Sequence, residues 1–66
     1  MAFRINGSEI EVRNGLTIGG LLSERKISPE RVVVEYNGEV LPKNAFNSTE
    51  IKNGDNIEVL SFVGGG

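Results

Sequence analysis

Four Asn-Gly pairs divide this 66-residue sequence into short segments, and they constrain its fold more than any other feature. The pairs are Asn6-Gly7, Asn14-Gly15, Asn37-Gly38 and Asn53-Gly54. Both residues of an Asn-Gly pair tolerate positive φ, which the tight turn of a β-hairpin requires. The sequence therefore predicts a chain of short elements joined by frequent turns.

The first pair predicts a hairpin whose register can be tested against the side chains. A two-residue loop at Asn6-Gly7 places Phe3 opposite Ile10, on a face that is nearly all apolar. On the other face Arg4 lies opposite Glu9, which is a favourable cross-strand charge pair. The apolar face comprises Met1, Phe3, Ile5, Ile10 and Val12. Turn chemistry and side-chain alternation thus agree on one register.

A short helix is predicted within residues 16–26. One helical face carries the apolar residues Ile18, Leu21 and Leu22. Thr17 suits the N-cap, and Arg25 and Lys26 suit the C-terminal end of the helix dipole. Gly19 and Gly20 weaken the helix, so it must depend on packing. Close packing of the helix on the sheet explains these glycines better than phosphate binding, because no lysine follows at phosphate-loop spacing.

The second half of the chain predicts three further strands. Val32–Tyr36 is rich in β-branched residues, and Asn37-Gly38 folds it back onto Val40 and Leu41. In that register Val34 faces Leu41 on one face of the sheet, and Glu35 faces Val40 on the other. Residues 43–52 are expected to be irregular, and residues 56–62 form the last strand. The fold class is therefore α+β, with one helix packed on a mixed sheet over residues 1–62 and a flexible tail at 63–66.

Composition excludes several kinds of chemistry. Cysteine and histidine are absent, which excludes disulfides, thiol nucleophiles, Cys/His metal sites and imidazole acid–base catalysis. A net charge of -2 disfavours nucleic acid and membrane surfaces as partners. The sequence shows neither a signal peptide nor an apolar run longer than three residues, so a cytoplasmic protein is expected. No catalytic or metal-binding group is predicted.

The last strand predicts a surface for a partner. If Ile57 and Val59 face the helix, then Leu60 and Phe62 point outward, and Val33 shares their face. Large apolar side chains on a solvated face favour a docking surface, although scattered exposed apolar residues are also ordinary.

The tail ends in Gly64, Gly65 and Gly66, which have no side chains to pack. Extended, the four residues from Val63 reach about 13 Å and can thread a channel too narrow for a Cβ. The carboxylate of Gly66 accepts nucleophiles once it is converted to an acyl-adenylate. A frayed terminus or a cloning scar would look the same in composition.

Taken together, these features resemble the ubiquitin-like β-grasp sulfur carriers. The segments VVVEYNGEVLPK (32–43) and IKNGDNIEV (51–59), with the Gly-Gly end, are similar to the sulfur carrier family of thiamine biosynthesis. The resemblance covers the whole chain. It implies a β-grasp fold in which the first and last strands lie parallel at the centre of the sheet.

The resemblance also implies a function and partners. A ubiquitin-activating-like adenylyltransferase would adenylate Gly66 with ATP and magnesium, and sulfur from a cysteine desulfurase route would replace the adenylate to give a thiocarboxylate. Thiazole synthase would then take the sulfur. Gly64 and Gly65 would thread into partner active sites, and Val33, Leu60 and Phe62 would dock beside them. The chain would be a monomeric cosubstrate, not an enzyme.

Three alternatives remain open at this stage. A molybdopterin-synthase-type carrier is typically longer and differs in the middle of the chain. A ubiquitin-like modifier would be conjugated through Gly66 to lysines of other proteins. A plain β-grasp interaction module would leave the tail inert.

Overall fold

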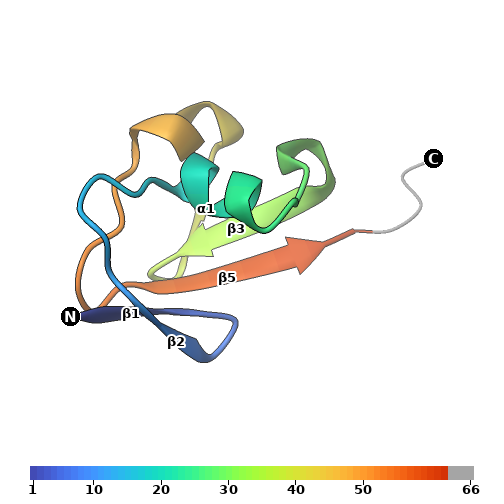
Figure 1. The fold of residues 1–66 in the computed structure, drawn as a ribbon. Coiled ribbons are helices and arrows are strands. Elements are labelled where there is room, and N and C mark those ends of the chain that lie inside the picture. The colour runs from blue at the N-terminus through green and yellow to red at the C-terminus, as the bar shows by residue number, and fades with distance from the viewer. Residues whose placement is uncertain (63–66) are drawn as a thin grey trace.

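The computed structural model describes residues 1–62, which form one mixed sheet carrying one α-helix (Figure 1). The elements are β1 (Ala2–Ile5), β2 (Ser8–Glu11), α1 (Ile18–Glu24), the 3-10 helix η1 (Pro29–Arg31), β3 (Val32–Tyr36), β4 (Glu39–Leu41), the 3-10 helix η2 (Lys43–Ser48) and β5 (Asn56–Ser61). The strand order is β2-β1-β5-β3-β4. β1 and β5 pair in parallel at the centre, and the other pairs are antiparallel. The α+β prediction and the parallel central pair are confirmed.

Two of the four Asn-Gly pairs form the predicted hairpin turns. Asn6 and Gly7 have φ of 50° and 86°, and Asn37 and Gly38 have φ of 53° and 88°. Positive φ at both central residues is what a type I′ turn requires. The registers are confirmed, with Phe3 opposite Ile10 in one hairpin and Glu35 opposite Val40 in the other. At Asn14-Gly15 and Asn53-Gly54 only the glycine has positive φ.

The two hairpin asparagines also hold β5 between the hairpins. The Oδ1 atom of Asn6 accepts a hydrogen bond of 2.8 Å from the backbone N–H of Val59. The Oδ1 atom of Asn37 accepts one of the same length from the N–H of Asn56. Each turn therefore supplies a side chain that fixes the central strand, a role that glycine in the same turn position would not provide.

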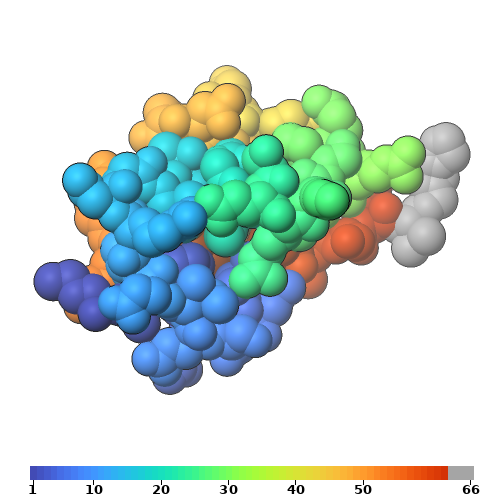
Figure 2. Space-filling model, viewed as in Figure 1, coloured from blue at the N-terminus to red at the C-terminus, as the bar shows by residue number. Residues whose placement is uncertain are grey.

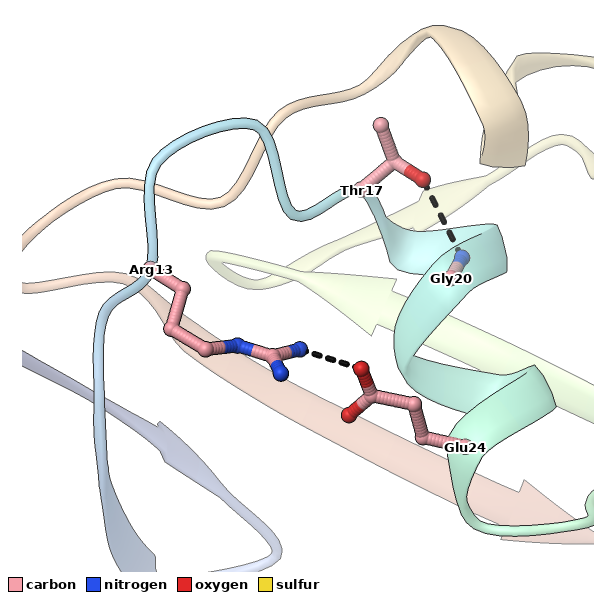
Figure 3. A network of polar contacts seen from close by, with 4 residues as sticks. All are labelled: Arg13, Thr17, Gly20 and Glu24. Atoms are coloured by element: carbon pink, nitrogen blue, oxygen red, sulfur yellow. Dashed lines mark hydrogen bonds and ion pairs between the residues drawn. The ribbon is translucent and has the colours of Figure 1, made fainter.

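Helix α1 begins where the sequence predicts (Figure 3). The Oγ1 atom of Thr17 accepts a hydrogen bond of 3.1 Å from the N–H of Gly20, so Thr17 is the N-cap. At the other end, Glu24 forms an ion pair with Arg13 from the preceding loop. Both side chains of that pair are exposed, so its contribution to stability is small, about 0–1 kcal/mol.

The helix is shorter than residues 16–26, because it ends at Glu24. Arg25 is the C-cap, and Lys26 adopts a left-handed φ of 59°, the position where helices commonly place glycine. No basic residue therefore lies in the last helical turn, contrary to the prediction. Ser28 occupies the cap position of η1, but its side chain makes no capping hydrogen bond. Among residues 1–62, no helix is long and apolar enough to cross a membrane.

The segment expected to be irregular contains the 3-10 helix η2, which the sequence analysis missed. η2 buries Phe46 beside α1, and Ile51 follows it into the core. Two backbone hydrogen bonds then join this segment to the start of α1: the N–H of Ile51 donates to Leu16, and that of Ile18 donates to Thr49. The second bond satisfies one of the free N–H groups that every helix start exposes.

One apolar layer lies between the sheet and the helical segments, which all sit on one side of the sheet (Figure 1). The buried core comprises Phe3, Ile5, Ile18, Leu21, Leu22, Val32, Val34, Phe46, Ile51 and Ile57. Met1, assigned to the same face by alternation, is 81% exposed, because it precedes the first strand. In the space-filling view, the residues between β2 and β3 cover most of the sheet, and the C-terminal part of β5 emerges at one end (Figure 2).

The two helix glycines differ in their surroundings. A Cβ on Gly19 would lie 1.9 Å from the Oδ1 atom of Asn47 in η2, whereas one on Gly20 would meet nothing closer than 3.4 Å. The predicted close packing of the helix on the sheet at these glycines is therefore wrong: Gly19 packs closely against Asn47 of η2, and the atoms nearest a Cβ on Gly20 belong to Thr17 and Leu16.

We expect Gly20→Ala to stabilise the domain by about 0.5–1 kcal/mol, because alanine is the better helix former. Gly19→Ala should gain less or lose stability, since the Asn47 side chain must first move away. Urea denaturation of both variants beside the wild type measures the difference. Equal gains at the two positions would show that Asn47 offers no resistance.

Candidate functional site

The candidate site lies where β5 leaves the sheet. The backbone N–H of Phe62 donates a hydrogen bond of 3.2 Å to the carbonyl of Arg31, so the last described residue is still attached to η1. The predicted carrier residue Gly66 and the predicted threading residues Gly64 and Gly65 lie outside the described residues. The roles of the three glycines therefore stay predictions.

The three predicted docking residues share the outer face of the sheet, opposite the helix. Val33 and Leu60 are directly opposite each other in the antiparallel pair of β3 and β5. Phe62 follows Leu60 by two residues and so faces the same side. All three are exposed, at 37%, 49% and 51% respectively, while Ile57 on the inner face is fully buried. The alternation of β5 is thus as expected, and docking itself stays a prediction.

Val40 extends this surface and was not among the predicted docking residues. Val40 lies on β4, opposite Glu35 of β3, and it is 65% exposed. The hairpin register already placed Val40 on the face of Glu35, so the sequence contained the signal. We call Val33, Val40, Leu60 and Phe62 the apolar patch. Exposed apolar groups gathered on one face are typical of an interaction surface.

Two glutamates border the apolar patch. Glu35 on β3 and Glu58 on β5 are directly opposite each other. Each lies two residues along its strand from a patch member on the same face, Val33 on β3 and Leu60 on β5. Both glutamates are half-buried. We call them the acidic pair. Cβ atoms that face each other across strands lie about 4.5–5.5 Å apart, and like charges in such positions are destabilising.

Titratable groups with displaced pKa values lie at the opposite end of β5. The Tyr36 hydroxyl donates a hydrogen bond of 2.6 Å to Asp55, which raises the pKa of Tyr36 to about 12, together with burial and the negative charge of Asp55. Burial alone would raise the pKa of Asp55, but hydrogen bonds from Tyr36, Lys52 and Asn37 outweigh it and lower that pKa. This cluster joins the second hairpin to the start of β5 and has a structural role.

The tyrosine should make stability depend on alkaline pH. The unfolded chain loses the phenol proton near pH 10.0 and the folded chain near pH 12, so stability falls as pH rises through this interval. Tyr36→Phe removes the hydrogen bond and should cost about 1 kcal/mol at neutral pH. The difference between the two proteins should shrink above pH 10, because phenylalanine does not titrate. Urea denaturation at several pH values measures it, and a constant difference would contradict the assignment.

Metal binding and phosphate binding can each be compared with the described residues. Within residues 1–62, no three carboxylates gather in a way that could hold a metal ion. The first helical turn of α1 has its Gly20 N–H bonded to Thr17 and its Gly19 packed against Asn47. What this part of the chain presents is a surface: the apolar patch, the acidic pair and the end of β5.

Comparison with known protein families gives a match over nearly the entire chain. Residues 2–66 match the model of the ThiS family. The sulfur carrier protein ThiS of Bacillus subtilis (strain 168) is 33% identical over 64 residues, covering 96% of this chain and 97% of that protein. A thiazole synthase of Paramagnetospirillum magneticum is 35% identical over all 66 residues, but the chain spans only 20% of that protein.

Solved structures agree with these matches. The thiamine biosynthesis protein (ThiS) from Geobacter metallireducens is 43% identical, with a TM-score of 0.80 and full coverage of both chains. A ubiquitin-like protein from Caldiarchaeum subterraneum has a TM-score of 0.57 over 98% of this chain and all of that one. At 23% identity this second likeness shows the fold alone, a ubiquitin-like one.

Proposed function

Since the chain belongs to the ThiS family, we propose that it carries sulfur for thiazole formation in thiamine biosynthesis, as a thiocarboxylate on Gly66. One observation carries the proposal: the family match extends through residue 66 and so includes the glycines that follow Phe62. The Bacillus subtilis relative, matched over almost its full length, is named a sulfur carrier protein.

The proposed chemistry takes place on the carboxylate of Gly66. A carboxylate is a poor electrophile, so it must first be activated. A carboxylate oxygen of Gly66 attacks the α-phosphorus of ATP, with magnesium, in an adenylyltransferase, and pyrophosphate leaves. The persulfide of a cysteine desulfurase then attacks the acyl carbon through its outer sulfur, a C–S bond forms and AMP leaves. A thiol reductant cleaves the S–S bond of this acyl disulfide, the desulfurase sulfur leaves in a disulfide with that thiol, and the thiocarboxylate is released. In this proposal the chain is a cosubstrate, and its partners supply the catalysis.

Thiazole synthase is the proposed acceptor of the sulfur. The Paramagnetospirillum magneticum thiazole synthase contains a segment that is 35% identical to this entire chain. A second thiazole synthase, from Magnetococcus marinus, contains one of equal identity. A carrier-like segment within the acceptor's own chain supports a direct contact between the two kinds of domain.

The test is the mass of the intact protein after reaction with its partners. The purified chain is incubated with the adenylyltransferase, ATP, magnesium, a cysteine desulfurase with cysteine, and a thiol reductant such as dithiothreitol. We expect a mass increase equal to the replacement of one oxygen by sulfur, located on Gly66 by fragmentation, and its loss when thiazole synthase and its substrates are added. An unchanged mass, or conjugates linked to lysines of other proteins, would refute the proposal.

A further inference from the structure

The acidic pair places two like charges directly opposite each other, an arrangement that is unfavourable in a sheet. Glu35 and Glu58 are half-buried and directly opposite each other, so their charges repel with reduced screening. Within residues 1–62, neither forms an ion pair. Arg4 is on the same face but lies beside Asn56, two positions from Glu58, and it faces Glu9 across β1 and β2. Among the described residues, the pair therefore has no ion-pair partner that would offset its repulsion.

The other glutamates of this face are placed differently. Glu9 lies opposite Arg4, and Glu11 lies 3.6 Å from the N-terminal amine. Carboxylates on the β1–β2 side of the face thus have positive groups nearby, whereas those on the β5–β3 side have apolar neighbours. Val33 and Leu60 adjoin the pair along the strands, and Val40 faces Glu35 from β4.

From this placement we propose that the acidic pair binds an arginine side chain of thiazole synthase, while the adjoining apolar patch packs on apolar side chains beside that arginine. The inference rests on the proposed function, because it takes its partner from there. A guanidinium has five N–H donors in a planar fork, so one arginine can donate to both carboxylates. Packing of the adjoining apolar patch on the partner would exclude water from that side of the pair, which strengthens these charge-assisted hydrogen bonds.

The charges argue against a second copy of the chain as the occupant. A symmetric dimer through this face would bring two acidic pairs, four carboxylates, against one another. Like charges brought together at an interface are costly and suppress the wrong partner. The same two glutamates that weaken self-association therefore favour a partner of opposite charge.

The position of the pair suits its proposed use. Glu58 lies on the strand that leads into the tail, four residues before Phe62. A partner that holds Glu58 and the apolar patch therefore holds the strand from which Gly66 extends. Fixing that strand raises the effective concentration of Gly66 in the acceptor's active site.

The experiment compares two double variants by titration calorimetry against purified thiazole synthase. Glu35→Gln/Glu58→Gln keeps the shapes and removes both charges. We expect it to bind at least about tenfold more weakly than the wild type and with a smaller salt dependence. Its urea midpoint should be unchanged or higher, because the repulsion is gone. The matched control, Glu9→Gln/Glu11→Gln on the same face, should bind like the wild type.

The possible outcomes separate this inference from the function. If the wild type and Glu35→Gln/Glu58→Gln bind thiazole synthase equally and both transfer sulfur, the proposed role of the acidic pair is overturned but the proposed function is not. Equal weakening of binding by the control variant overturns the role of the acidic pair too. The loss of any two negative charges on this face would then weaken binding to the same extent. Weakened binding to the adenylyltransferase but not to thiazole synthase overturns the chosen partner. A wild-type chain that neither binds thiazole synthase nor passes sulfur to it overturns the proposed function as well.

Discussion

A variant that lacks Gly66 should form no thiocarboxylate, and its thermal unfolding midpoint should equal that of the wild type. All ten buried core residues lie between Phe3 and Ile57, so the deletion removes nothing from the described core. Intact mass spectrometry after incubation with the adenylyltransferase, ATP, magnesium and a sulfur source measures the first effect. Differential scanning calorimetry measures the second.

The expected loss follows from the length of one residue. If a partner holds the apolar patch, the distance from Phe62 to its active site is fixed. Removing Gly66 draws the terminal carboxylate back by up to about 3.5 Å. A misplacement of about 1 Å can already cost a hundredfold in rate, so a shift of a whole residue should abolish adenylation. The carboxylate left on Gly65 is chemically the same but is in the wrong place.

A matched control separates position from chemistry. A peptide tag attached directly after Gly66, with a protease that cleaves immediately after Gly66, should also prevent thiocarboxylate formation. The carboxyl carbon of Gly66 is then part of a peptide bond and cannot be adenylated. Cleavage that regenerates the Gly66 terminus should restore the reaction in the same sample. Full activity of the uncleaved protein, or of the variant that lacks Gly66, would contradict the role of this residue.

The sequence predicts the two hairpins correctly because their determinants are local. In each hairpin a two-residue turn sets the register, and the side chains on either side agree with it. Arg4 opposite Glu9 and Val34 opposite Leu41 both follow from the position of an Asn-Gly pair. The helix cap Thr17 is equally local, since its partner Gly20 is three residues away.

The acidic pair could not be predicted in this way. Glu35 and Glu58 lie on strands with β4 and η2 between them in the sequence, so no turn fixes their register. Alternation indicates only that each faces outward. The same limit applies to Asn6, whose turn conformation is local but whose hydrogen bond to Val59 spans 53 positions. Contacts of this kind depend on the assembled sheet.

The helix η2 was missed because its evidence is also tertiary. Residues 43–48 show no apolar periodicity, and Phe46 is their one large apolar residue. What holds the segment is the burial of Phe46 against the core and the packing of Asn47 on Gly19. Short 3-10 helices generally lack the repeated pattern from which a longer helix is predicted.

The second large effect is expected in the core, where Ile57→Ala should destabilise the domain by about 2–4 kcal/mol. Ile57 is fully buried in the central strand, with Ile5 beside it on β1 and Tyr36 beside it on β3. Truncation removes three carbon atoms from a position enclosed on both sides, so the neighbours can fill the space only in part. Urea denaturation followed by circular dichroism measures the change.

The small size of the domain makes this loss severe. Typical stabilities of roughly 0.05–0.15 kcal/mol per residue give a chain of 66 residues only about 3–10 kcal/mol in total. Ile57→Ala would therefore remove a large share of the stability, and a fraction of the molecules could be unfolded before denaturant is added. Ile57→Val, expected to cost about 0.5–1.5 kcal/mol, keeps the effect measurable in that case.

Leu60→Ala is the matched control, because Leu60 lies three residues further along the same strand on the opposite face. With 49% of the side chain exposed, its truncation should change stability by less than about 1 kcal/mol. Its effect should fall on binding instead, since the apolar patch loses its member on β5. If Leu60→Ala unfolds the domain while Ile57→Ala leaves it stable, the two faces of β5 are reversed, and the apolar patch cannot be a docking surface.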